Sequence, residues 1–115
     1  MGCGIVTGMP SRALEERLEQ LRVSYRARLG EKLDALDATL RRALQDATPA
    51  STDELWAVAH NLAGTAGSYG FKDLAKAVRE MEDLLAPFRG SEISLPKSVA
   101  EGLVLLLADA RRLAD

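Results

Sequence analysis

The stretch AHNLAGTAGSYGF, residues 59 to 71, contains the single histidine of a 115-residue chain. His60 is followed by small residues, with glycines at positions 64, 67 and 70. An exposed neutral imidazole can attack phosphorus through a ring nitrogen and form a phosphoramidate bond. The chain has neither the P-loop motif nor the glycine loop of kinases, and no carboxylates are spaced for Mg²⁺. The pattern predicts a site that carries a phosphoryl group without taking it from ATP.

His60 is predicted to lie on the outer side of its helix. At about 100° per residue, the apolar residues of this helix group within roughly 50° of one direction, the core side, and His60 points about 140° away from it. Those apolar residues are Leu55, Val58, Ala59, Leu62 and Ala66. The expected surface neighbours of His60 are Ala57, Ala63, Gly64 and Gly67. Such small side chains would let a partner approach the imidazole closely, although the glycines could instead serve helix packing, and the histidine could be merely solvated.

The elements that position this site are all expected to be helices, because leucine and alanine are frequent and aromatic residues make up 4% of the chain. Apolar steps of three and four residues run over 11–46, where one long helix or two abutting helices are possible. Further helices are predicted from about Asp53 to Ser68, from Phe71 to Leu85 and from Pro96 onward. Short connections favour an antiparallel up-and-down four-helix bundle with an additional or extended N-terminal helix.

The apolar stripes of these helices predict the core. The first helix contributes Leu14, Leu18, Leu21, Tyr25, Leu29, Leu33, Leu36, Leu40 and Leu44. The last two helices contribute Leu74, Val78, Met81 and Leu85, then Val99, Leu103, Leu106, Ala110 and Leu113. We expect one domain over residues 11–115 and a flexible, glycine-rich tail over residues 1–10.

Several classes of function are disfavoured by composition. The net charge of −2 is spread along the chain and offers no basic surface for nucleic acid. The longest apolar run, residues 103–108, is too short to cross a bilayer. The single cysteine has no partner for a disulfide or a zinc site, which fits a reducing cytoplasm. We expect no bound metal or cofactor, and a monomer, because each helix carries a charged face.

The stretch HNLAGTAGSYGF resembles the histidine-containing phosphotransfer (HPt) domain family, whose pattern is a histidine, a glycine four residues later and another glycine ten residues later. His60, Gly64 and Gly70 fill these positions. The resemblance extends over about 11–113, including the four-helix outline. The chain departs from many members at Ala63, where they carry a lysine that helps to bind the phosphoryl oxygens, although an alanine subgroup reading HxLAG is also similar.

The resemblance implies that His60 accepts a phosphoryl group from the aspartate of a receiver domain and passes it to another receiver. Receiver domains and a sensor histidine kinase are the implied partners, and the Mg²⁺ is expected on the receiver. Similarity to the phosphotransfer domain of chemotaxis kinases implies that Glu82 orients the histidine by accepting the Nδ1 proton, which leaves Nε2 as the nucleophile. Glu82 falls roughly 70° from the apolar centre of its helix, where an ordinary surface glutamate is the alternative.

Other residues are candidates for contact with the phosphoryl group or with a partner. Lys72, Lys76 and Arg79 share one helix face by their spacing, where a solvated, salt-bridged surface is the alternative. Trp56 lies one turn before His60 and could dock a partner or cover an edge of the bundle.

Two rival functions stay open. The chain could be the phosphoacceptor domain of a larger, chemotaxis-type histidine kinase, or a non-catalytic helical adaptor that binds a receiver. A hydrolytic or metal enzyme is disfavoured, because one histidine without convergent carboxylates or cysteines supplies no ligand set.

Overall fold

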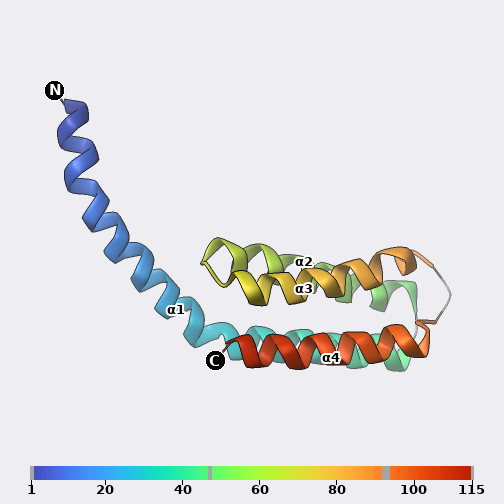
Figure 1. The fold of residues 1–115 in the computed structure, drawn as a ribbon. Coiled ribbons are helices and arrows are strands. Elements are labelled where there is room, and N and C mark those ends of the chain that lie inside the picture. Colours follow the sequence, from blue (N-terminus) through green and yellow to red (C-terminus); the bar gives the residue numbers. More distant parts are fainter. Residues whose placement is uncertain (1, 47, 92–93, 115) are drawn as a thin grey trace.

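The computed structural model consists of four α-helices in its described part (Figure 1). That part comprises the backbone of residues 2–46, 48–91 and 94–114, with side chains from residue 12 onward. The helices are α1 (Gly2–Asp46), α2 (Pro49–Ser68), α3 (Lys72–Leu85) and α4 (Lys97–Ala114), and a 3₁₀ turn, η1 (Ala86–Phe88), follows α3. The described residues contain no strand, which confirms the all-α prediction.

The helices form a four-sided bundle in which each packs against two neighbours. Helices α1 and α3 both pack against α2 and α4. The short connections make successive helices run in opposite directions, as predicted (Figure 1). The largest fully buried side chains come from all four helices and form one core. They are Tyr25, Leu29, Leu33, Leu36, Leu40, Leu55, Leu74, Val78, Met81, Leu85 and Leu103.

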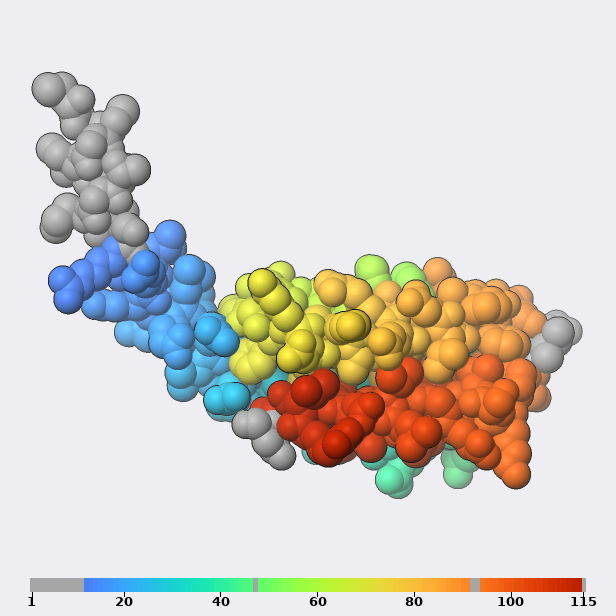
Figure 2. Space-filling view, viewed as in Figure 1, coloured from blue at the N-terminus to red at the C-terminus, as the bar shows by residue number. Residues whose placement is uncertain are grey.

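Helix α1 is one continuous helix, which settles the choice between one helix and two in favour of an extended first helix. Its 45 residues measure about 68 Å along the curved helix axis, against about 30 Å for α2, so its N-terminal part runs beyond the end of the bundle (Figures 1 and 2). Leu14 and Leu18 are therefore 57% and 49% exposed, and their predicted place in the core is wrong. Periodicity groups these leucines on one helix face, but no other helix of the described residues lies opposite that face at this end of α1.

For the predicted flexible tail, residues 1–10, the structure describes only part of the chain, namely the backbone from Gly2 onward. Helix α1 begins at Gly2, while Met1 and the side chains of residues 2–11 lie outside the described residues. Flexibility of residues 1–10 therefore stays a prediction.

Helix α2 begins one turn earlier than the predicted start near Asp53. Thr48 is its N-cap and Pro49 occupies the first turn, where the missing N–H of proline costs nothing. The Thr48 hydroxyl accepts from the Ser51 N–H at 3.1 Å, and the Ser51 hydroxyl accepts from the Thr48 N–H at 3.2 Å. This cap places Asp53 within the helix rather than at its start.

The turn from α2 to α3 depends on Gly70, whose φ of +88° is favourable only for glycine. The N–H of Phe71 bonds to the carbonyl of Ala66 at 2.9 Å and closes the turn. Because the connection is this short, α3 lies directly beside the face of α2 that carries His60. All four core residues predicted for α3 are buried.

The core side of α4 differs from its predicted stripe by a small rotation. Leu107 is 6% exposed, whereas Leu106 is only partly buried and Leu113 is 42% exposed. Leucines at three consecutive positions, 105–107, make the periodicity ambiguous there. Packing buries Leu107, which lies one helical turn after Leu103. Leu44 of α1 is 39% exposed and also lies outside the core. Within the described residues, none of the helices combines the length and the apolar character that a membrane-spanning helix needs.

Candidate functional site

A stripe of exposed and partly buried residues on α2 carries the histidine. Asp53, Trp56, His60, Gly64 and Gly67 follow at steps of three and four residues and therefore lie above one another on the helix. The His60 side chain is 60% exposed, so it points to solvent as the helical periodicity predicts. A partner protein can therefore reach the imidazole without any movement of the bundle.

Helix α3 places a carboxylate beside this imidazole. Oε2 of Glu82 lies 3.4 Å from Nδ1 of His60, and the two residues are 22 positions apart in the chain. The Glu82 side chain is only 15% exposed, and Oε1 is buried with no hydrogen-bond partner in the described part of the chain. A carboxylate in this position can accept an N–H from Nδ1, which leaves the lone pair on Nε2 facing outward.

The small residues around His60 divide into three kinds. A Cβ added at Gly64 would meet no atom of another described element within 4 Å, so this position leaves the surface beside the imidazole flat and open. At Gly67 a Cβ would lie 3.3 Å from Nη2 of Arg79 and 3.7 Å from Cβ of Ala75, so this glycine serves close approach of α3. Ala63 is 1% exposed, and the prediction that it lies on the exposed surface is wrong, because α3 lies close enough to cover this shoulder of α2.

Comparison with known families identifies the family to which this fold belongs. The sequence model of the Hpt domain family matches residues 11–113, which is nearly the whole chain. The chain belongs to the Hpt domain family. Hpt domains are phosphocarriers in two-component signalling and have no catalytic site of their own. Searches of curated proteins and of solved structures each gave no significant match.

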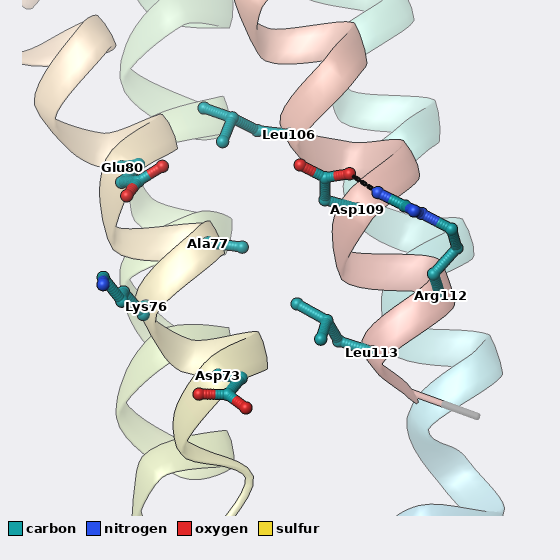
Figure 3. A pocket seen from close by; sticks show the side chains of 8 residues that line it. All are labelled: Asp73, Lys76, Ala77, Glu80, Leu106, Asp109, Arg112 and Leu113. Carbon is teal, nitrogen blue, oxygen red and sulfur yellow. Dashed lines mark hydrogen bonds and ion pairs between the residues drawn. The ribbon is translucent and has the colours of Figure 1, made fainter.

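In this Hpt domain the predicted basic residues do not share one environment. Arg79 reaches the surface of α2 at Gly67, as its 3.3 Å approach to the Cβ position there shows. Lys76 instead lines a hollow of about 440 Å³ between α3 and α4 (Figure 3). Asp73, Glu80, Asp109 and Arg112 line the same hollow, so its charge is mixed. Lys72 is exposed at the first position of α3. Of these three cations, Arg79 is the one that the structure shows at the surface of α2.

Trp56 packs against the histidine of the Hpt domain. Its ring lies 4.7 Å from the imidazole centroid at an interplanar angle of 10°, a stacked arrangement. The guanidinium of Arg89 lies 3.7 Å from the centroid of the same indole. The sequence carries no local signal for Arg89, because this residue follows η1 and reaches the site only through the fold.

In the described residues, no group of three or more histidine, cysteine, aspartate or glutamate side chains is placed to hold a metal ion. The groups that the structure brings together here are the imidazole of His60, the carboxylate of Glu82, the stacked indole of Trp56 and two nearby arginines.

Proposed function

We propose that this Hpt domain is a phosphorelay intermediate that accepts a phosphoryl group on Nε2 of His60 from a receiver aspartate and passes it to a second receiver. The observation that carries the proposal is the exposed imidazole with Glu82 at its Nδ1. A histidine that served only packing would be buried, and a solvated one would lack the partly buried carboxylate. We propose receiver domains and an upstream sensor histidine kinase as its partners, and the cytoplasm as its location.

The chemical step follows from the protonation of the ring. With the Nδ1 proton shared with Glu82, the lone pair on Nε2 attacks the phosphorus of the aspartyl phosphate. The Nε2–P bond forms as the P–O bond to the aspartate breaks, and the electron pair leaves on the aspartate as a carboxylate. The Nδ1 proton stays on the ring, whose positive charge Glu82 stabilises. The reverse sequence returns the phosphoryl group to an aspartate, so transfer runs in both directions.

The receiver supplies the remaining parts of this reaction. An Mg²⁺ ion in the receiver's acidic pocket would offset the charge of the transferring group. This chain contributes an exposed nucleophile and the flat surface at Gly64. Such a modest surface suits transient docking, and we propose that the domain acts as a monomer.

The test is phosphoryl transfer from a panel of radiolabelled phospho-receivers to the wild type and to His60→Gln. We expect an acid-labile label on the wild type and none on the variant, with equal helical circular dichroism, because the His60 side chain is 60% exposed and lies outside the core. Measurable receiver binding without any label on the folded wild type would overturn the proposal in favour of a binding-only adaptor. Labelling by a kinase and ATP, with no label accepted from any phospho-receiver, would favour a kinase phosphoacceptor domain.

A further inference from the structure

The loop after η1 is attached to the same stripe of α2 that carries His60. The N–H of Gly90 donates to Oδ1 of Asp53 at 3.1 Å. Gly90 has a φ of +70°, which turns the chain at this point. Since Asp53, Trp56 and His60 share one helix face, this bond holds the neighbouring Arg89 at the N-terminal end of the stripe.

The side chain of Arg89 follows this stripe toward the histidine. Its guanidinium contacts the indole of Trp56, and that indole is stacked on the imidazole. Trp56 lies one helical turn before His60, about 6 Å along the axis, whereas Gly67, where Arg79 lies, is about 10 Å beyond it. Both arginines therefore flank the histidine, but only Arg89 contacts a side chain that itself contacts the imidazole.

A phosphoryl group on His60 would need a cation close by. The group carries close to two negative charges at neutral pH, and Glu82 adds a carboxylate at 3.4 Å from the ring. The neighbouring position 63 holds a buried alanine, which cannot supply positive charge. An arginine guanidinium binds phosphoryl oxygens through two parallel, charge-assisted N–H donors, which is a stronger interaction than its contact with an aromatic ring.

We propose that Arg89 is the phosphoryl-binding cation of this domain, resting on Trp56 while His60 is unmodified and moving to the phosphoryl oxygens when His60 is phosphorylated. This inference rests on the proposed function only for the identity of the physiological donor. It concerns phosphorylated His60, whichever reagent or protein phosphorylates it. Arg89 forms no covalent bond, so the bonds made and broken in transfer are unchanged.

The first experiment needs no receiver. Phosphoramidate phosphorylates histidine directly, and ³¹P NMR then follows the phosphoryl group through a pH titration of wild type, Arg89→Ala, Arg89→Lys and Arg79→Ala. A bound guanidinium favours the dianion, so the titration midpoint of wild type lies at lower pH than that of Arg89→Ala, with Arg89→Lys between them. Equal midpoints for wild type and Arg89→Ala, or a shift caused only by Arg79→Ala, would overturn the proposal.

The second experiment measures how a labelled phosphoryl group divides at equilibrium between a receiver and this domain. Loss of the Arg89 contact is expected to shift the ratio roughly tenfold toward the receiver. Arg41→Ala is the matched control, because it removes the same charge from an exposed arginine that pairs with Asp37 within α1. An unchanged ratio in Arg89→Ala, or an equal shift in Arg41→Ala, would contradict the assignment.

The two experiments separate failure of this inference from failure of the proposed function. If no receiver transfers its label but the phosphoramidate-labelled protein shows the Arg89-dependent titration, the relay proposal fails and Arg89 remains assigned. If receivers transfer normally and neither measurement depends on Arg89, the relay proposal stands and Arg89 is excluded.

Discussion

The carboxylate of Glu82 on α3 lies 3.4 Å from Nδ1 of His60 on α2, and its side chain is 15% exposed beside an imidazole that is 60% exposed. One partner of the pair is thus held by packing while the other faces solvent. A carboxylate at this position can accept the Nδ1 proton and leave Nε2 accessible, which is the arrangement that the proposed phosphoryl transfer to His60 requires.

Replacement of Glu82 should therefore separate function from stability. We expect Glu82→Met to slow phosphoryl transfer at least about tenfold, because the ring loses its orienting acceptor and its countercharge. The free energy of unfolding should stay equal or rise, since the variant removes a buried oxygen that lacks a partner among the described residues. Transfer rates from a phospho-receiver and urea denaturation test both parts. A variant that is destabilised but transfers at the normal rate would show that Glu82 is structural.

Gly64 offers a matched pair of substitutions on the proposed docking surface. Gly64→Leu should weaken receiver binding at least about tenfold, because a branched side chain would hold the partner away from the imidazole. Its stability should not fall, since the added Cβ has no neighbour within 4 Å. Gly64→Ala serves as the control, with near-normal binding and up to about 1 kcal/mol of added helix stability. Isothermal titration calorimetry with a receiver measures the three affinities. If Gly64→Leu bound the receiver as tightly as wild type, docking at this surface would be excluded.

The hydroxyl of Tyr25 gives the fold a dependence on alkaline pH. It forms a 2.7 Å hydrogen bond with Thr65, and burial raises the pKa of Tyr25 above the usual 10.0. The folded state thus favours the protonated phenol, so this contribution is complete below about pH 10 and is lost as the pH rises through the folded pKa. Tyr25→Phe should cost about 1 kcal/mol at pH 8 and lose stability less steeply above pH 10. Urea midpoints at pH 8 and pH 11 measure this, and parallel losses in both proteins would contradict it.

The leucine stripe of α1 predicts two different responses to one substitution. Leu33 is 2% exposed, and Leu33→Ala should cost about 2–5 kcal/mol through the cavity it leaves. Leu18 is 49% exposed on the projecting part, and Leu18→Ala should change stability by less than about 0.5 kcal/mol. Chemical denaturation compares the two. A large loss in Leu18→Ala would mean that another surface covers this part of α1 in solution.

The contrast between these two leucines shows what periodicity can predict. Spacing within one helix determines which side chains share a face, and it correctly placed His60 outward and the α3 stripe inward. It does not determine whether another helix lies opposite that face. Leu14 and Leu18 were misplaced for this reason, and Ala63 for the converse reason, because α3 approaches α2 more closely than a helical wheel can show.

Residues that reach the site from other elements were predicted less completely. Glu82 could be proposed from two signals together: the family resemblance, and its place at the edge of the apolar face of α3. Arg89 could not, because its place depends on the bond from Gly90 to Asp53 and on the indole beneath it. Both features are properties of a loop packed on a helix, and neither leaves a periodic pattern in the sequence.

The measurement that tests the central claim most directly is a reconstituted relay of two receivers with this domain between them. A labelled phosphoryl group on the first receiver should appear on the second only when wild-type protein is present, with a transient acid-labile label on the domain. His60→Gln should abolish the passage while its helical spectrum is unchanged. Passage that persists in His60→Gln, or its absence with wild type and receivers that both bind it, would contradict the account.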